Sequence, residues 1–126
     1  MPDAFCVYIV DDEDSVRHAL SRLMGACGYQ TRTYGSPEQF LDEVAANSPG
    51  CVLMDITMPK LTGLQVQSRL KAKGIDLPVI AISARDDDGV RQSARKLGAS
   101  FFFHKPVDDQ ALLDAISWVS EAKHDA

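Results

Sequence analysis

The segment "CVLMDITMP" (51–59) is the most informative stretch for the fold. Apolar or weakly polar residues run without a break into Asp55, and Met58 and Pro59 follow shortly after. Such a run is typical of a strand buried on both faces of a parallel sheet. A carboxylate at the end of this strand would stand at the sheet edge where ligand sites of open α/β sheets form, and Pro59 would help the chain turn out of the strand.

Outward from this segment, apolar runs alternate with helical patterns along the chain. The expected strands are 5–10, 29–34, 51–55, 78–83 and 100–104. The expected helices are 15–27, a helix that starts after the N-cap Ser36, 61–73, 86–97 and 108–122. Strict alternation predicts parallel strands joined by right-handed helical crossovers, with helices on both sheet faces. We therefore expect one α/β domain over residues 1–126, a (βα)5 three-layer sandwich.

The composition excludes several classes of protein. The chain has 126 residues and a net charge of −5, which argues against a broad nucleic-acid contact because that needs a clustered basic face. No run approaches the ~20 apolar residues of a membrane helix. The N-terminal residues meet acids before any long apolar run, unlike a signal peptide. We expect a cytoplasmic protein without membrane contact and, because the sequence ends at Ala126, a free-standing one.

The cysteines and histidines show no metal-site spacing. An odd count of cysteines without a C-x-x-C pair predicts neither a disulfide framework nor a zinc site. Cys6, Cys27 and Cys51 are therefore expected to be small buried hydrophobic residues. The histidines are expected to bind no metal: His18, His104 and His124.

Polar residues stand at the ends of four expected strands, and these ends meet at one edge of a parallel sheet. Carboxylates held close together repel one another, and a divalent cation such as Mg²⁺ removes the conflict. The expected ligands are Asp12 and Asp55, with Asp11 acting through water and the backbone carbonyl of Thr57 as a third oxygen.

The same edge can hold a phosphate once a cation is bound. Lys105 would add a positive charge and Ser83 a hydroxyl donor. Phosphoryl transfer needs chiefly positioning and charge stabilisation, and a carboxylate can itself be the nucleophile. Asp55 is the best candidate nucleophile, because it lies between the acidic end of 5–10 and the Ser83 end of 78–83.

The sequence resembles the receiver domain of bacterial two-component response regulators over essentially its whole length. The motifs that carry the resemblance are "VDDE" (10–13), "MDITMP" (54–59) with Gly63 beyond it, "SA" (83–84) and "KP" (105–106). Each motif is weak alone, but their order at successive strand ends is specific. The stretches "YIVDDEDSVRHAL" and "YGSPEQFL" resemble the nitrogen-fixation subgroup of these regulators.

The resemblance implies a flavodoxin-like fold with strand order 2-1-3-4-5. It implies that Asp55 accepts a phosphoryl group from a histidine kinase or phosphotransfer protein, with Mg²⁺ or Mn²⁺ bound. The family's acidic pair falls on Asp11 and Asp12, its hydroxyl residue on Ser83 and its lysine on Lys105. The chain would then be a substrate and switch that takes part in its own phosphorylation and dephosphorylation, and not an enzyme.

The resemblance also implies how the signal leaves the site. Ser83 and the switch aromatic Phe102 would move, and the face formed by 86–97, 100–104 and 108–122 would change. That face would contact a downstream protein or a second copy of the chain.

Some residues depart from the family pattern or tune it. Phe102 has no hydroxyl, and Val107 stands where many relatives have Phe. The resemblance implies that Thr57 and Arg85 occupy the positions that tune the phosphoryl lifetime in the family. We also expect a cis bond between Lys105 and Pro106, because the lysine must turn back toward the carboxylates after its strand.

The aromatic residues near the C-terminus divide into two groups. Phe101 and Phe103 are expected in the core, with the apolar stripe of the last helix: Leu112, Ile116 and Val119. Trp118 lies off that stripe by helical angle and is a candidate for contact with a partner.

Three alternatives remain. The chain could be a receiver cut from a longer DNA-binding transcriptional regulator. A metal-dependent phosphatase with an aspartate nucleophile would need a second acid where Thr57 stands. A flavodoxin-like cofactor carrier would need hydroxyls and amides in its first loop, where residues 11–14 are all acids.

Overall fold

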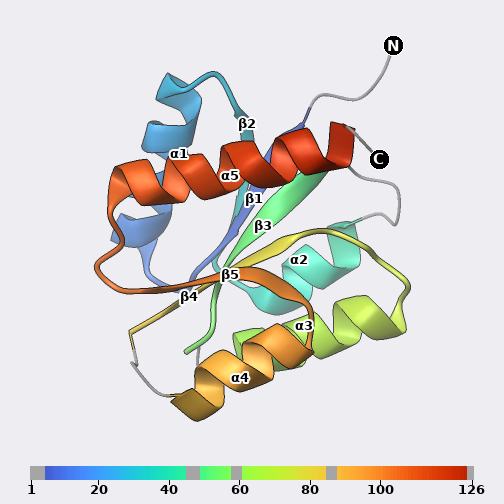
Figure 1. The fold of residues 1–126 in the computed structure, drawn as a ribbon. Coiled ribbons are helices and arrows are strands. Elements are labelled where there is room, and N and C mark those ends of the chain that lie inside the picture. Colours follow the sequence, from blue (N-terminus) through green and yellow to red (C-terminus); the bar gives the residue numbers. More distant parts are fainter. Residues whose placement is uncertain (1–4, 45–48, 58–60, 85–87, 125–126) are drawn as a thin grey trace.

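The computed structural model describes residues 5–44, 49–57, 61–84 and 88–124. Within these residues five strands alternate with five helices, as Figure 1 shows. The strands are β1 (Cys6–Val10), β2 (Gln30–Tyr34), β3 (Gly50–Asp55), β4 (Val79–Ser83) and β5 (Ala99–His104). The helices are α1 (Asp14–Ala26), α2 (Pro37–Glu43), α3 (Gly63–Ala72), α4 (Asp88–Lys96) and α5 (Asp109–His124). The predicted alternation is confirmed, while Pro59 and Arg85 lie outside the described residues.

The strands form one parallel sheet in the order β2-β1-β3-β4-β5, as predicted. The chain first winds from β1 outward to β2 and then crosses back to β3. The winding direction therefore switches between β1 and β3. Ligands of open α/β sheets bind outside the carboxyl ends of the strands at such a point.

Helices cover both faces of the sheet, which gives the predicted three-layer sandwich (Figure 1). One face carries α1 and α5 and buries Met24 and Ile116 against the strands. The other face carries α2, α3 and α4 and buries Phe40, Val66 and Ala94. Apolar burial on both faces is the main stabilising contribution to this architecture.

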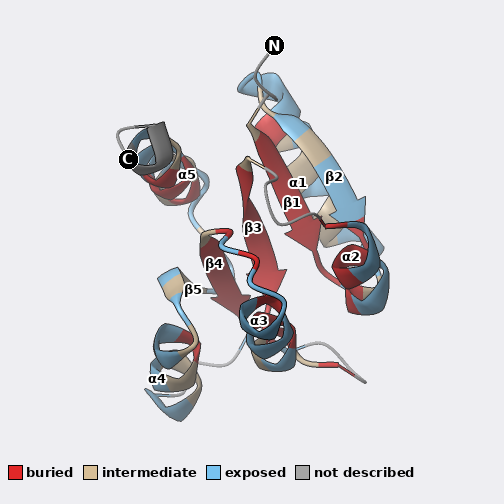
Figure 2. Cartoon of the chain, turned by 90° about the vertical axis from the view of Figure 1, so that its right-hand side faces the viewer, coloured by how far each residue is buried: buried red, intermediate tan, exposed pale blue. Residues whose placement is uncertain are grey.

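Strand burial follows the place of each strand in the sheet, as Figure 2 shows. Every residue of β1, β3 and β4 is buried, because each of these strands has a neighbour on both sides and helices above and below. The edge strand β2 is mostly exposed. The other edge strand is β5, where Phe101 and Phe103 are only partly buried. Both rings pack against the core as predicted, but their burial is only partial because an edge strand has a neighbouring strand on one side only.

Two helices begin at N-caps that the sequence encodes. Ser36 accepts a hydrogen bond from the Gln39 N–H at 3.4 Å, as predicted for its N-cap role. Helix α3 begins at Gly63, two residues later than predicted. Thr62 is the N-cap: its Oγ1 accepts from the Gln65 N–H at 3.2 Å, and the Thr62 N–H donates to Gln65 Oε1 at 2.8 Å. This reciprocal capping box fixes the start of the helix.

Helix α5 places its predicted stripe in the core. Leu112, Ile116 and Val119 are buried, and the helix extends to His124, two residues past the predicted end. Trp118 is 60% exposed and packs edge-on against Phe101 with the ring centroids 5.7 Å apart. Among the described helices, α5 included, none combines the length and apolar character that crossing a membrane requires.

The cysteines occupy different environments. Cys6 and Cys51 are buried, and burial raises the pKa of Cys51 to about 12 and raises the pKa of Cys6. Cys27 is exposed, so the prediction that it is buried was wrong. It is the C-cap residue of α1, where the chain leaves the helix and passes over the protein surface.

Candidate functional site

Four predicted site residues stand at the carboxyl edge of the sheet, at or directly after the ends of the strands: Asp11 after β1, Asp55 on β3, Ser83 on β4 and Lys105 after β5. The register of β1 on β3 places Asp11 level with Asp55. The register of β3 on β4 pairs Asp55 with Ile82, next to Ser83. The parallel sheet therefore aligns residues that are far apart in the sequence.

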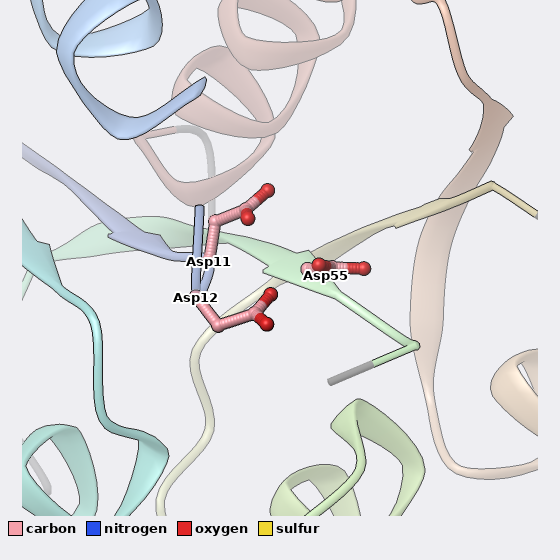
Figure 3. A group of neighbouring side chains, drawn as sticks. All are labelled: Asp11, Asp12 and Asp55. Carbon is pink, nitrogen blue, oxygen red and sulfur yellow. The ribbon is translucent and has the colours of Figure 1, made fainter. Parts of the chain in front are cut away.

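The three acidic residues Asp11, Asp12 and Asp55 converge, as Figure 3 shows. Each offers a carboxylate oxygen, and these oxygens all lie within 4.8 Å of one another. Asp11 and Asp55 are buried, and Asp12 is exposed. Buried carboxylates this close repel one another unless a cation compensates them. Hard oxygen donors with one side open to solvent fit a divalent cation such as Mg²⁺, which usually keeps several waters.

Lys105 supplies part of the compensating charge. Its Nζ lies 3.2 Å from Asp11 Oδ2, 3.6 Å from Asp55 Oδ2 and 3.8 Å from Glu13 Oε1. Burial alone would lower the pKa of Lys105, but Asp55, Asp11 and Glu13 raise it further than burial lowers it, so the net pKa is raised. The ammonium is therefore charged at neutral pH. The Lys105–Pro106 peptide bond is cis, as predicted.

Local hydrogen bonds orient the two buried carboxylates. Asp55 Oδ1 accepts from the Thr57 N–H at 3.0 Å and from the Thr57 hydroxyl at 3.2 Å. Asp11 Oδ1 accepts from the Glu13 N–H at 2.9 Å. In both residues one carboxylate oxygen is held by the following turn while the other faces Lys105. These bonds from Thr57 to the Asp55 side chain were not predicted, although an Asp side chain commonly accepts from the amide two residues on in an Asx turn.

Ser83 and Phe102 lie in different surroundings. Ser83 is fully buried, and its main-chain carbonyl accepts from the Lys105 N–H at 2.8 Å. Phe102 packs on the face of the sheet that carries α4 and is aligned with Ala81. The guanidinium carbon of Arg91 on α4 lies 5.1 Å from the centroid of the Phe102 ring, within the range of a cation–π contact. The sequence did not indicate Arg91 as a partner of the aromatic residue.

Gly63 allows α3 to begin directly behind Asp55. A Cβ at this position would lie 2.6 Å from the Asp55 carbonyl oxygen and 2.8 Å from Ile56 Cα. Both are backbone atoms of the segment that carries Asp55, and they cannot rotate away as a side chain would. The Gly63 N–H donates to the Ile56 carbonyl at 3.1 Å, which fixes the close approach.

We expect Gly63→Ala to lower the free energy of unfolding by about 2 kcal/mol, because the added methyl group forces backbone shifts in a packed region. Urea unfolding of the metal-free protein measures the change. Gly25→Ala is the control: it lies in α1 with nothing within 4 Å of the added Cβ, so it should be neutral or stabilising. Equal free energies of unfolding for Gly63→Ala and the wild type would show that the start of α3 does not lie tightly against the Asp55 backbone.

Comparison with known families narrows the kinds of chemistry that the residues at the carboxyl edge of the sheet could support. The sequence model of the family described as "Response regulator receiver domain" matches residues 7–117. The chain belongs to this family. It is a receiver domain of two-component response regulators, and receiver domains of this kind interact with histidine kinases.

The relatives of this receiver domain include named regulators. It is 40% identical over 115 residues to the transcriptional regulatory protein TdiR of Thauera aromatica, covering 91% of this chain and 51% of TdiR. It is 39% identical over 113 residues to the response regulator TodT of Pseudomonas putida, covering 90% and 50%. It is 34% identical over 116 residues to FixJ of Azorhizobium caulinodans, covering 92% and 55%. The chain thus spans about half the length of these relatives, which are FixJ-like and TodT-like regulators.

Solved structures agree with the fold. The structure named FixJ-N is 32% identical, with a TM-score of 0.87 and 96% of each chain covered. A response regulator receiver protein from Burkholderia phymatum is 38% identical, with a TM-score of 0.79, covering 93% of this chain and 95% of that one. StyR is 32% identical, with a TM-score of 0.91, covering 98% of this chain and 62% of StyR.

Proposed function

We propose that Asp55 of this receiver domain accepts a phosphoryl group from the phosphohistidine of a histidine kinase or phosphotransfer protein. A carboxylate oxygen of Asp55 attacks phosphorus, the P–N bond to the donor histidine breaks, and the imidazole leaves with the bonding electron pair and takes up a proton. The product is an acyl phosphate on Asp55. The observation that carries this proposal is the setting of Asp55: buried at the end of β3, fixed by Thr57 and 3.6 Å from the Lys105 ammonium.

A divalent cation completes the proposed site. The proposed ligands are Asp11, Asp12, Asp55 and the backbone carbonyl of Thr57, with Mg²⁺ as the cation and Mn²⁺ as a substitute that prefers similar oxygen ligands. When bound, the cation neutralises charge on the phosphoryl oxygens during transfer. The convergence of three carboxylate oxygens within 4.8 Å supports this ligand set.

Lys105 and Ser83 are proposed to hold the phosphoryl oxygens. The phosphoryl group adds about −1.5 to −2 charges at neutral pH, so it competes with the carboxylates for the Lys105 ammonium. The chain acts chemically only on its own aspartate, and we therefore propose a substrate and switch rather than an enzyme.

The proposed switch runs from the phosphoryl group to the face made by α4, β5 and α5. The phosphoryl oxygens draw the Ser83 hydroxyl inward and Phe102 moves into the vacated space, which changes the populations of two conformations of that face. Arg91 lies over Phe102, so the movement also changes its cation–π contact with α4. The exposed Trp118 belongs to α5 and is a proposed contact for a downstream protein or a second copy of the chain.

Treatment with acetyl phosphate tests the proposed function. In Mg²⁺ the intact mass should increase by one phosphoryl group, and in EDTA it should stay unchanged over the same time, because the clustered carboxylates repel the anionic donor. Restoring Mg²⁺ should restore the gain. An equal gain in EDTA would exclude a metal-dependent acceptor.

Lys105→Ala should separate acceptance of the phosphoryl group from transmission of the signal to the face made by α4, β5 and α5. The variant should still gain a phosphoryl group in Mg²⁺, but the change in amide exchange over α4, β5 and α5 that follows phosphorylation in the wild type should be largely lost. The exposed Lys71→Ala on α3 is the matched control and should respond like the wild type. A wild-type exchange response in Lys105→Ala would remove Lys105 from the switch.

We also propose that residues 1–126 form one receiver domain that acts in the cytoplasm, and its net charge of −5 argues against direct nucleic-acid binding. A second candidate is that this receiver is one part of a longer transcriptional regulator. TdiR and FixJ are named transcriptional regulatory proteins, and the chain covers 51% and 55% of them. Reading the gene beyond the codon for Ala126 decides between the two candidates.

A further inference from the structure

Arg17 reaches from α1 to the main chain of the acidic loop, residues 11–13, which joins β1 to α1. Its Nη1 donates to the Asp11 carbonyl oxygen at 2.7 Å, and its Nη2 donates to the Asp14 carboxylate in an ion pair. The Arg17 side chain is only 16% exposed, and its contact with the Asp11 carbonyl is partly buried, whereas its ion pair with Asp14 is exposed. Lys105 holds the carboxylate of the same Asp11. Two cations from different elements therefore fix one residue, Arg17 at the backbone and Lys105 at the side chain.

Gly35, the residue after β2, leaves room for this guanidinium. A Cβ on Gly35 would lie 2.8 Å from Arg17 Nη1 and 3.1 Å from Arg17 Cζ. The Gly35 φ lies outside the left-handed region that favours glycine, so alanine is compatible with its backbone. The preceding residue, Tyr34, accepts a hydrogen bond from the Asp11 N–H at 3.1 Å. The guanidinium thus lies where α1, the end of β2 and the acidic loop meet.

We propose that Arg17 is a positioning residue for the cation site. By holding the Asp11 carbonyl and the Asp14 carboxylate, it fixes the course of the loop between them, so that Asp11 and Asp12 point their oxygens toward Asp55. This inference rests on the proposed cation site. Asp14 has no part in the three-acid cluster and contributes by anchoring Arg17.

The alternative is that Arg17 only offsets the charge of the acids. The two roles predict opposite signs for the change in Mg²⁺ affinity. A positive charge near the site repels Mg²⁺, so if Arg17 acts only through its charge, removing it would tighten Mg²⁺ binding. Removing a residue that orders the ligands would weaken binding, and losing an outer contact of this kind typically costs ~10-fold to ~100-fold in metal affinity.

Three substitutions separate these roles. Arg17→Met keeps part of the aliphatic stem and removes the charge. Arg17→Lys keeps the charge but loses the planar fork that can reach two acceptors. Gly35→Ala keeps Arg17 and displaces its guanidinium. Calorimetry with Mg²⁺ alone should give a dissociation constant raised ~10-fold in all three, and Arg17→Met combined with Gly35→Ala should be no weaker than Arg17→Met alone.

A second readout does not depend on the cation. In EDTA, the Glu13 amide, which donates to Asp11 Oδ1, should lose protection from hydrogen exchange in Arg17→Met and in Gly35→Ala. If wild type binds no Mg²⁺, the proposed cation site fails, and this exchange measurement then decides the role of Arg17 by itself. If Arg17→Met does not fold by circular dichroism, Gly35→Ala decides, because it retains the arginine.

The inference is overturned by either of two results. One is Mg²⁺ binding that is tighter or unchanged in Arg17→Met and equal to wild type in Arg17→Lys. The other is wild-type protection of the Glu13 amide in EDTA in both Arg17→Met and Gly35→Ala.

Discussion

Asp55→Asn should fold like the wild type and gain no phosphoryl group from acetyl phosphate in Mg²⁺. The amide has nearly the shape of the carboxylate, and its oxygen can still accept from the Thr57 N–H. It lacks the negative charge and the nucleophilic strength that attack on phosphorus requires. Lys105 keeps Asp11 at 3.2 Å and Glu13 at 3.8 Å as partners, so the loss of one carboxylate does not leave the ammonium uncompensated.

Intact-mass spectrometry measures this loss, and circular dichroism with urea unfolding checks the fold. Asp114→Asn is the matched control, since it removes the same charge from an exposed position on α5. The control should gain a phosphoryl group as the wild type does. A full gain on Asp55→Asn would contradict the proposed mechanism and leave only the fold.

Asp12→Ala should raise the dissociation constant for Mg²⁺ by at least ~10-fold. Asp12 is the exposed member of the three-acid cluster, so it can bind the cation from the side that is open to solvent. Replacing an outer contact alone typically costs ~10-fold to ~100-fold in metal affinity, and a direct ligand should cost no less. Calorimetry is the suitable measurement, because tryptophan fluorescence would depend on Trp118, which lies on α5 and is largely exposed.

Asp114→Ala controls for the general effect of removing one negative charge, and its Mg²⁺ affinity should change little at moderate salt because exposed charges are screened. Unchanged affinity in Asp12→Ala would remove Asp12 from the ligand set. An equal loss in both variants would indicate that only net charge attracts the cation.

The fold could be predicted from the sequence to a large extent because its signals are local. Continuous apolar strands and one-faced helices in strict order are enough to predict a doubly covered parallel sheet. Departures in the degree of burial lie where tertiary context decides. Phe101 and Phe103 look like core residues, but they stand on the edge strand β5 and are partly buried. The start of α3, by contrast, was predicted two residues early although its local signal, the capping residues Thr62 and Gln65, was readable.

The candidate site likewise has a part that could be predicted from the sequence and a part that could not. Residues that end strands could be predicted because a parallel sheet brings all carboxyl ends to one edge, and Asp11, Asp55 and Lys105 do meet there. Contacts of long side chains that do not stand at strand ends, such as those of Arg17 and Arg91, could not be predicted. Arg17 reaching the Asp11 carbonyl past Gly35 depends on the packing of α1 against the end of β2. No periodicity or spacing in a single sequence encodes such a contact.

Chemical mapping of the phosphoryl group tests the central claim most directly. The wild-type protein is phosphorylated with acetyl phosphate in Mg²⁺ and reduced with borohydride, which converts an aspartyl phosphate to homoserine. It is then digested and sequenced by mass spectrometry. We predict homoserine at position 55 and unmodified aspartate at positions 11 and 12. Homoserine at Asp11 or Asp12 with intact Asp55 would contradict this prediction.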